Sequence, residues 1–198
     1  MSKNKRIDVM VDLETLGTRY DAAVFQIAAA SFDIESGVII DDFNAVADIS
    51  KLTAEDGVIK GETLKWWLDT DKDLLAELVG NGTYSPRDLI TVFHRWLDEL
   101  TLEYDDVCLW GNGILFDNAI IRHKFESYGY EYPIRYHNDR DVRTIFEIAQ
   151  AKTGLSWYDL RDRIYDKSLK AHDAVNDVEN QIALVSKCYR ILTKGESV

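Results

Sequence analysis

Asp12 and Glu14 have the spacing expected of two carboxylates that act together. Both lie in residues 7–14, where apolar residues occupy the odd-numbered positions. This alternation predicts a β-strand, and residues two apart on a strand point to the same face. The turn that follows contains Gly17, which allows the backbone to lie close to a ligand. Because exposed strands commonly carry solvated acids, the pair indicates chemistry only in combination with other groups.

A further acid, Asp117, follows a second apolar segment. Residues 107–110 are apolar and run into the glycine-containing turn Gly111–Gly113, with Asp117 shortly after it. In open α/β sheets, functional sites gather at the carboxyl ends of strands, where this aspartate would join Glu14. On its own, an aspartate at the start of a helix is equally well explained as a cap or as a partner of the helix dipole.

His172 and Asp177 are separated by five residues near the last predicted helix. In a regular helix that separation places two side chains about 140° apart, so the pair converges only if His172 lies on the preceding loop. Asp173 is a suitable N-cap residue and would supply this break. The alternative is that His172 is a surface loop residue and Asp177 is solvated. The joint occurrence with the earlier acids favours a common site.

Four carboxylates at one site would repel one another by roughly 1 to 4 kcal/mol for each close pair. Divalent cations remove this cost, and ligands that are all oxygen select Mg²⁺ or Mn²⁺ over zinc. Two such ions, about 3.5 to 4 Å apart, are the arrangement used for in-line displacement at phosphodiesters. A nearby histidine can then take the proton of an attacking water. The pattern therefore predicts metal-dependent hydrolysis of phosphodiester bonds.

The remaining sequence predicts the elements that position these residues. We expect one domain over residues 1–198, with an α/β architecture in which helices cover both faces of a mixed sheet. A hairpin turn is expected at 35–37, and Ser85 with Pro86 begins a long helix. The expected strands are 7–14, 24–32, 38–47 and 107–110, and the expected helices are 62–68, 72–78, 86 onward, 116–128, 142–152 and 174–192.

The composition limits the kinds of partner. The 198 residues are 46% hydrophobic, and 35 acidic against 23 basic residues give a net charge of −12. Such a charge disfavours long nonspecific contact with a phosphate backbone, so a nucleic-acid substrate would be held over few nucleotides. Cys108 and Cys188 lie in apolar segments and are expected to be free buried thiols. The basic start, residues 1–6, precedes no apolar region long enough for export or membrane insertion, so we expect a cytoplasmic protein without a membrane partner.

The residues in this order resemble the DEDDh family of 3′ to 5′ exonucleases, a branch of the ribonuclease H-like superfamily. The resemblance spans residues 12 to 177, nearly the whole chain, and fills all five functional positions of the family. The segments Thr63–Trp67 and Arg140–Thr144 further resemble a subgroup of phage and bacterial exonucleases and exoribonucleases. The five matched positions are Asp12, Glu14, Asp117, His172 and Asp177.

The resemblance implies a ribonuclease H-like sheet of about five strands and two metal ions at the strand ends. It implies release of nucleoside 5′-monophosphates from the 3′ end of single-stranded DNA or RNA. Asp12 would bridge both ions, the other three acids would share the remaining coordination, and His172 would be the general base. Residues just after the first motif commonly meet the terminal bases in such enzymes. The candidate substrate contacts are Thr15 and Leu16, with Phe116 and Trp66 as weaker candidates for base stacking.

Several alternatives stay open at this level. An aspartyl phosphatase shares the strand-borne acid pair, but it would need an aspartate in place of Glu14 and would leave His172 without a role. A non-catalytic acidic metal-binding module would have no chemical reason to keep both His172 and Asp177. Arg140 and Arg143 are candidates for phosphate contacts or for salt bridges. The apolar pair Trp66–Trp67 is a candidate surface for a homodimer, although paired tryptophans in a short helix are more often part of the core.

Overall fold

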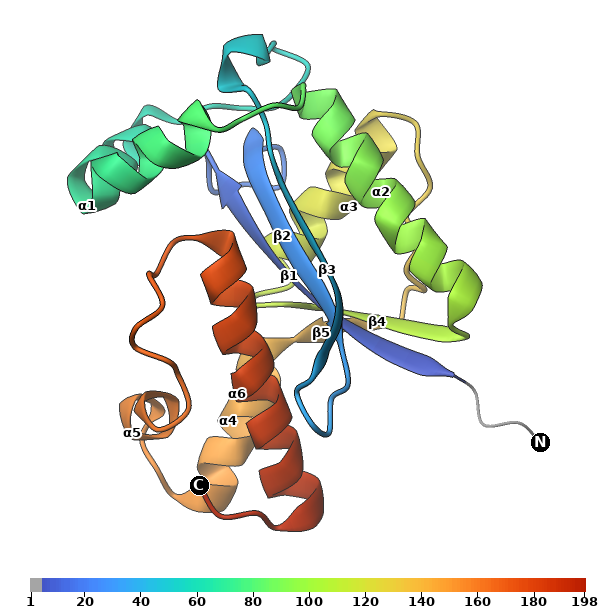
Figure 1. The fold of residues 1–198 in the computed structure, drawn as a ribbon, viewed down its shortest axis with the longest axis vertical. Helices are drawn as coiled ribbons and strands as arrows, with labels where there is room; N and C mark the ends of the chain where they lie inside the picture. The colour runs from blue at the N-terminus through green and yellow to red at the C-terminus, as the bar shows by residue number, and fades with distance from the viewer. Residues whose placement is uncertain (1–4) are drawn as a thin grey trace.

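A computed structural model describes residues 5–198, and its centre is a five-stranded mixed sheet (Figure 1). The strand order is β3-β2-β1-β4-β5; β1 pairs antiparallel with β2 and parallel with β4. The α/β sheet expected from the sequence is confirmed. The strands are β1 (Arg6–Thr15), β2 (Val24–Phe32), β3 (Ile39–Val46), β4 (Asp106–Gly111) and β5 (Asp139–Asp141).

Helices cover both faces of this sheet (Figure 1). One pair packs on the face formed by the odd-numbered residues of β1, and another pair packs on the opposite face. A further helix lies across the end of the sheet towards which β1 runs. In chain order the helices are α1 (Gly61–Gly80), α2 (Pro86–Glu103), α3 (Asp117–Ser127), α4 (Val142–Thr153), α5 (Trp157–Asp162) and α6 (Ala174–Lys194), with a 3₁₀ turn η1 (Ile49–Lys51).

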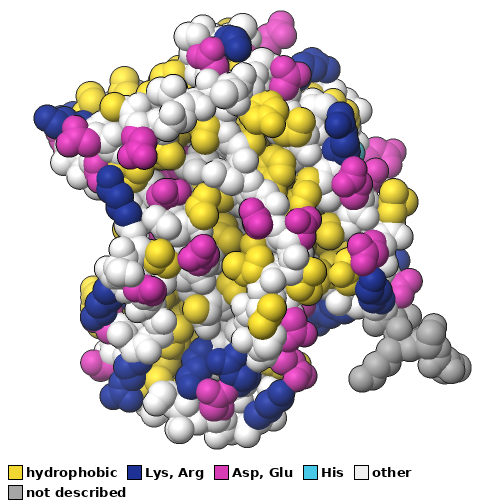
Figure 2. Space-filling view, viewed as in Figure 1, with side chains coloured by type: hydrophobic (Ala, Val, Ile, Leu, Met, Phe, Trp, Pro, Cys, Tyr) yellow, Lys and Arg dark blue, Asp and Glu magenta, His cyan; other side chains and the backbone are white. Residues whose placement is uncertain are grey.

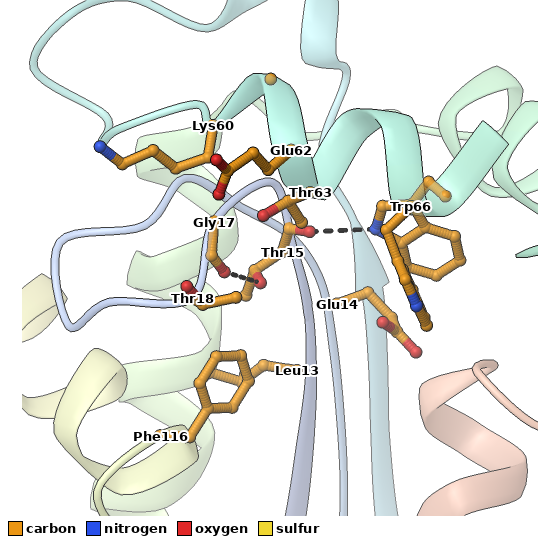
Figure 3. Close-up of a pocket in the computed structure, with 12 residues that line it drawn as sticks. Leu13, Glu14, Thr15, Gly17, Thr18, Lys60, Glu62, Thr63, Trp66 and Phe116 are labelled. Carbon is orange, nitrogen blue, oxygen red and sulfur yellow. Dashed lines mark hydrogen bonds between the residues drawn. The ribbon is translucent and has the colours of Figure 1, made fainter. Parts of the chain in front are cut away.

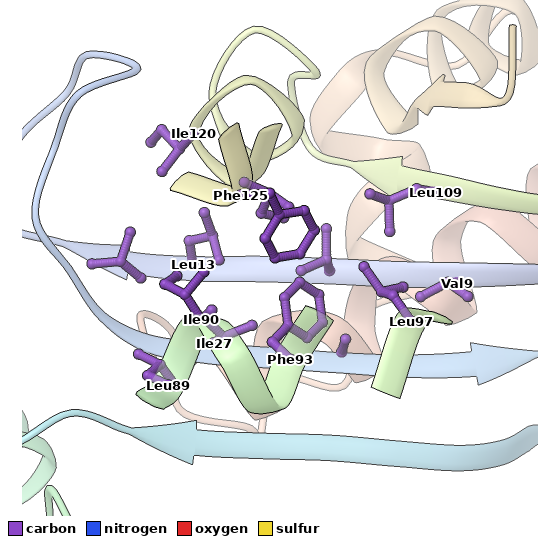
Figure 4. Packing of buried hydrophobic residues seen from close by; sticks show 14 of the residues in the cluster. Val9, Leu13, Ile27, Leu89, Ile90, Phe93, Leu97, Leu109, Ile120 and Phe125 are labelled. Atoms are coloured by element: carbon purple, nitrogen blue, oxygen red, sulfur yellow. The ribbon is translucent and has the colours of Figure 1, made fainter. Parts of the chain in front are cut away.

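The central strand β1 is buried on both faces. Its odd-numbered residues, including Val9 and Leu13, pack against α2 and α3 (Figure 4). On the opposite face, Met10 belongs to a second cluster beneath α4 and α6, and the acids Asp8 and Glu14 are 2% and 8% exposed. The interpretation of the acids on this strand as a solvated face therefore does not hold. Asp8 is stabilised locally, since its carboxylate accepts a hydrogen bond from Trp110 Nε1 at 2.7 Å.

Helix boundaries follow the capping signals of the sequence. The Ser85 hydroxyl accepts a hydrogen bond from the backbone N–H of Asp88 at 3.1 Å, as expected for the cap of α2. The two short helices expected at 62–68 and 72–78 form one element, α1, which is broken at Asp71 by a non-helical backbone (φ −154°, ψ 80°).

Two elements were not expected from the sequence. Strand β5 has three residues, all charged, and carries no hydrophobic period. Helix α5 has six residues and begins at the Ser156 cap. Both are too short for periodicity to reveal them.

Other features agree with the expectations in part. Cys108 and Cys188 are free and buried. Among residues 5–198, none of the helices combines the length and apolar character needed to cross a membrane. The basic start, residues 1–6, which we expect to precede no segment for export or membrane insertion, includes residues 1–4, and these lie outside the described residues. The space-filling view shows acidic side chains spread over one face, with Lys and Arg in separate groups nearer its edges (Figure 2).

Candidate active site

Three carboxylates converge where the end of β1 meets the start of α6. Asp12 and Glu14 lie on the last residues of β1, and Asp177 lies on the first turn of α6. One oxygen from each of the three lies within 4.8 Å of the others. The alternation along β1 places Asp12 and Glu14 on one face, and the N-terminus of α6 brings Asp177 to the same point. The sequence-based expectation of a shared acidic site at this strand end matches this geometry.

Asp117, the fourth expected acid, is not part of this group of three, although its charge acts on Asp12. It is the first residue of α3 and is 3% exposed. Its close packing depends on Gly111 at the end of β4, because a Cβ added at Gly111 would lie 3.1 Å from Asp117 Cβ and 2.4 Å from Asn118 Oδ1. The charge of Asp117 also raises the pKa of Asp12. Because β1 and β4 are parallel, the end of β4, with Asp117 shortly after it, lies at the same end of the sheet as Asp12 and Glu14.

These acids are in an environment that disfavours their charged forms. Burial, followed by the charges of Asp117 and Asp177, raises the pKa of Asp12 well above its usual value. Burial and the charges of Asp12 and Asp177 raise the pKa of Glu14 to about 10. Burial raises the pKa of Asp117 to about 7, against backbone hydrogen bonds that lower it, and burial also raises the pKa of Asp177. The cluster thus favours a positive charge, either protons or a bound cation.

The donor set fits a hard divalent cation. The proposed ligand atoms are all carboxylate oxygens, which suit Mg²⁺ and Mn²⁺. The protein donors that contact them are neutral: Gln181 Nε2 donates to Asp12 Oδ1 at 2.8 Å, and the backbone N–H of His172 donates to Asp177 Oδ2 at 3.1 Å. Sequence reasoning missed Gln181. Its signal was available, because it lies four residues after Asp177 and therefore on the same face of α6.

His172 lies on the loop before α6, as its spacing from Asp177 requires. Asp173 is the N-cap of α6 and accepts a hydrogen bond from the backbone N–H of Val175 at 3.1 Å. His172 itself has φ of +65°, a left-handed conformation that is uncommon for a residue with a side chain. Its imidazole packs edge-on against Trp66, with ring centroids 5.0 Å apart. A constrained backbone at this position is consistent with a functional role.

The loop that carries His172 is held from two helices. From α6, Asn180 Oδ1 accepts a hydrogen bond from the backbone N–H of Asp166 at 2.8 Å, and Asn176 Nδ2 donates to the backbone oxygen of Lys170 at 3.0 Å. From α1, Asp71 forms a salt bridge with Lys170 Nζ at 3.0 Å. The break in α1 therefore lies beside the loop that positions His172.

A cavity of about 920 Å³ opens beside Glu14 (Figure 3). Three of the four expected substrate contacts line it, namely Thr15, Phe116 and Trp66. The fourth, Leu16, is 4% exposed and packs in a core cluster with Trp67, so the structure does not bring its side chain to the cavity. The other lining residues are Leu13, Gly17, Thr18, Lys60, Gly61, Glu62, Thr63 and Trp67. Of these, Gly61, Glu62, Thr63 and Trp67 come from α1.

The two neighbouring tryptophans have different environments. Trp67 is 1% exposed, and its Nε1 donates to the backbone oxygen of Thr15 at 3.1 Å, so it fastens α1 to the end of β1. Trp66 is 44% exposed and borders the cavity. The pair is therefore not a continuous apolar surface, and a homodimer through this segment stays a prediction.

The basic residues near the site contact protein groups in this structure. Arg143 Nε donates to Asn112 Oδ1 at 3.4 Å, and its charge acts to lower the pKa of Asp117. Arg140 donates to the backbone oxygen of His137 at 2.6 Å. Asp141 caps α4 by accepting a hydrogen bond from the backbone N–H of Arg143 at 2.7 Å. Of the two arginines, Arg143 lies beside the acidic site.

Comparison with known proteins gives concordant matches. A family model described as "3'-5' exoribonuclease Rv2179c-like domain" matches residues 7–189. A protein of Enterobacteria phage T4 described as an exodeoxyribonuclease is 22% identical over 204 residues, which cover 92% of this chain and 89% of the phage protein.

Solved structures share the fold. The zinc-bound E. coli ExoI complex with single-stranded DNA superposes with a TM-score of 0.64 and 19% identity over 96% of this chain. The match covers 41% of the ExoI chain, so this chain spans less than half of that relative. Cell-death related nuclease 4 (CRN-4) gives a TM-score of 0.67 at 14% identity, covering 96% of this chain and 64% of the nuclease.

Proposed function

Because the chain belongs to the 3'-5' exoribonuclease Rv2179c-like domain family, we propose that it removes nucleotides from the 3′ end of single-stranded nucleic acid. It is a hydrolase of the DEDD-type 3′ to 5′ exonuclease class, and this class implies the use of divalent metal ions. The observation that carries the proposal is the convergence of Asp12, Glu14 and Asp177 within 4.8 Å, beside a cavity of about 920 Å³. The family match favours this activity over an aspartyl phosphatase or a non-catalytic acidic module.

In this proposal Asp12, Glu14, Asp117 and Asp177 hold two Mg²⁺ or Mn²⁺ ions. Bound divalent ions supply charge neutralisation at the phosphate and make a water molecule more acidic. The raised pKa values of Asp12 and Glu14 support the assignment, because a cation would relieve the same repulsion that now favours protonation. Gln181 orients Asp12 through its hydrogen bond of 2.8 Å.

His172 is proposed as the general base that takes the proton of the attacking water. The bond that breaks joins phosphorus to the 3′ oxygen of the penultimate nucleotide, so the terminal nucleotide leaves with its 5′ phosphate. The backbone hydrogen bond from His172 to Asp177 supports this role, since it links the loop directly to the acidic cluster. General acid–base catalysis by a positioned side chain typically contributes about 10² to 10⁴ in rate.

The terminal nucleoside is proposed to occupy the cavity beside Glu14. Trp66 and Phe116 lie on different sides of it and present aromatic surfaces to a base (Figure 3). Thr15 also borders the cavity, and its hydroxyl donates to the backbone oxygen of Gly17 at 2.6 Å. The family description names an exoribonuclease, whereas the phage relative is described as an exodeoxyribonuclease. Both RNA and DNA are therefore candidate substrates.

The proposal is tested with matched RNA and DNA oligonucleotides of identical sequence. Each is incubated with the protein in Mg²⁺, in Mn²⁺ and in a chelator. We expect at least one of the oligonucleotides to be shortened in either metal and neither to be shortened in the chelator. Metal-independent degradation, or degradation of neither polymer, would contradict the proposal. The two core clusters on the opposite faces of the sheet share its strands, which supports the proposal that residues 1–198 form a single domain.

A further inference from the structure

Lys124 is a buried lysine that the proposed chemistry does not use. It lies on α3, seven residues after Asp117, and is 3% exposed. Its Nζ donates to the backbone oxygen of Asp56 at 2.7 Å. Burial lowers the pKa of Lys124 to about 8, although the charges of Asp56 and Asp21 act in the opposite direction. Because a buried ammonium group is costly unless it is paired and hydrogen-bonded, its contacts indicate what it stabilises.

Asp56 is the centre of these contacts. Its carboxylate accepts hydrogen bonds from the Tyr128 hydroxyl at 2.5 Å and from the Thr53 hydroxyl at 2.7 Å. Burial acts to raise the pKa of Asp56, but these hydrogen bonds outweigh it and hold the pKa below its usual value. Lys124 and Tyr128 are one helical turn apart, so the end of α3 holds the loop around Asp56 at two points.

The residue after Asp56 must be a glycine for Lys124 to approach. Gly57 has φ of +133°, which residues with a side chain rarely adopt. A Cβ at this position would lie 2.5 Å from Lys124 Nζ and 2.7 Å from the backbone nitrogen of Ala23. The lysine, the loop and the start of β2 therefore meet in one close contact.

Backbone hydrogen bonds connect this contact to the wall of the cavity. Val58 accepts from the N–H of Ala23 at 3.1 Å and donates to the oxygen of Asp21 at 2.8 Å. The N–H of Lys60 donates to the oxygen of Leu16 at 2.7 Å. The chain then enters α1, whose first residues line the cavity together with Gly17. The segment 56–60 thus lies between Lys124 and the cavity wall.

We propose that Lys124 is a positioning residue that fixes the cavity wall at Gly17, Thr18 and 60–63 relative to α3, and so sets the affinity for the terminal nucleotide. The inference rests on the proposed function of that cavity. It concerns binding more than the chemical step, because α3 is held independently by Ile120 and Phe125 in the main core cluster. Asp117 at the other end of α3 therefore keeps its place when Lys124 is replaced.

The test replaces Lys124 by Met, which keeps much of the buried stem and removes the ammonium group. We expect KM for an oligonucleotide to rise about tenfold, as for the loss of a hydrogen bond to a charged group, with kcat within about twofold. Tyr128→Phe removes one hydrogen bond, keeps the ring, and should raise KM by about threefold. It also serves as the milder variant if Lys124→Met does not fold. Ile191→Ala, at the far end of α6, is the control for a general loss of stability.

Amide hydrogen exchange gives a second readout that does not depend on activity. In Lys124→Met we expect faster exchange at the N–H groups of Val58 and Lys60, and unchanged exchange in the strands. An unchanged KM in both variants, or a rise in KM equalled by Ile191→Ala, would overturn the inference. If the parent protein lacks exonuclease activity, the proposed function fails on that result. Exchange at Val58 and Lys60 then decides separately whether Lys124 holds the wall.

Discussion

The ring of Trp66 lies edge-on to the imidazole of His172, with centroids 5.0 Å apart and planes at 87°. Trp66 also lines the cavity proposed for the terminal nucleoside (Figure 3). One side chain therefore contacts both the proposed general base and the proposed binding site. A nucleobase that stacks on Trp66 would contact the same ring as His172. Binding of the substrate and positioning of His172 should therefore be coupled.

Replacing Trp66 by Leu should affect both steps. Loss of base stacking, worth about 1 to 3 kcal/mol, predicts a KM increase of about tenfold or more. Loss of the contact with His172 predicts a kcat decrease of about tenfold, because the imidazole is less well oriented. Trp66→Phe keeps an aromatic ring and should keep both KM and kcat close to the parent values. Trp96→Phe on α2 is the control, and steady-state kinetics of all three variants on one oligonucleotide make the comparison. Equal kinetics for Trp66→Leu and the parent would remove Trp66 from the site.

Replacing Asp12 by Asn should abolish activity while stabilising the metal-free protein. The amide keeps an oxygen that can accept the hydrogen bond from Gln181. It carries no charge, so folding of the metal-free protein no longer requires either protonation of this buried acid or burial of its charge beside Asp117 and Asp177. Removing roughly 1 to 4 kcal/mol of this cost predicts a Tm in chelator about 2 to 16 °C above that of the parent. Activity should fall at least about a hundredfold. A melting curve that is lower than the parent's in chelator would argue against a cluster of mutually repelling acids.

The stability of the metal-free protein should decrease as pH rises. Glu14 has a pKa of about 10 in the folded state against an ordinary value of 4.5, so between these values the folded state holds a proton that the unfolded state has released. The stabilising effect of this proton is complete below the pKa of Glu14 in the unfolded state. It is lost as pH rises from the ordinary pKa of 4.5 to the folded-state pKa of about 10. We expect Tm in chelator to be lower at about pH 9 than at about pH 6, and the difference to be smaller in Glu14→Gln.

Metal binding should release protons for the same reason. Asp117, with a pKa of about 7, and Glu14, with a pKa of about 10, are partly or fully protonated near neutrality when no cation is present, and the raised pKa of Asp12 acts in the same direction. Calorimetric titration with Mn²⁺ in buffers of different ionisation enthalpy measures the number of protons released. Binding with no proton release near neutral pH would mean that the acids are already ionised.

Replacing Gly111 by Ala should weaken metal binding without a change in any ligand. The added Cβ would lie 2.4 Å from Asn118 Oδ1 and 3.2 Å from Asp117 Oδ2, so the start of α3 must shift. We expect metal affinity to fall about 10- to 100-fold, the range for groups that orient ligands. Gly80→Ala is the matched control, because a Cβ there meets no atom within 4 Å. Equal metal affinity in both variants would show that Asp117 does not depend on this close packing.

The sequence revealed those parts of the site that local rules determine. Alternation along β1 placed Asp12 and Glu14 on one face, and the Asp173 cap placed His172 on a loop within reach of Asp177. The fold class followed from strands that precede and alternate with helices, and it is confirmed by the five-stranded mixed sheet. The roles of these residues in metal binding and catalysis stay predictions.

The parts that could not be predicted depend on contacts between distant segments. Lys124 and Asp56 are 68 residues apart, and nothing in either segment indicates the other. The burial of Leu16 depends on Trp67, which belongs to α1 and packs with Leu16 in one core cluster. Strand β5 forms only because β4 offers an edge for pairing. Tertiary packing decides each of these.

The central claim is that the acids and His172 act together on the 3′-terminal phosphodiester. The most direct measurement identifies the product released from a single strand that carries a radiolabelled phosphate in the internucleotide linkage nearest its 3′ end. The parent is compared with Asp12→Ala and His172→Ala. We predict that the parent releases labelled nucleoside 5′-monophosphate from the outset, that Asp12→Ala releases none, and that His172→Ala is slower by about 10² to 10⁴ while it still binds metal. Release from the 5′ end, or an Asp12→Ala protein as active as the parent, would contradict the claim.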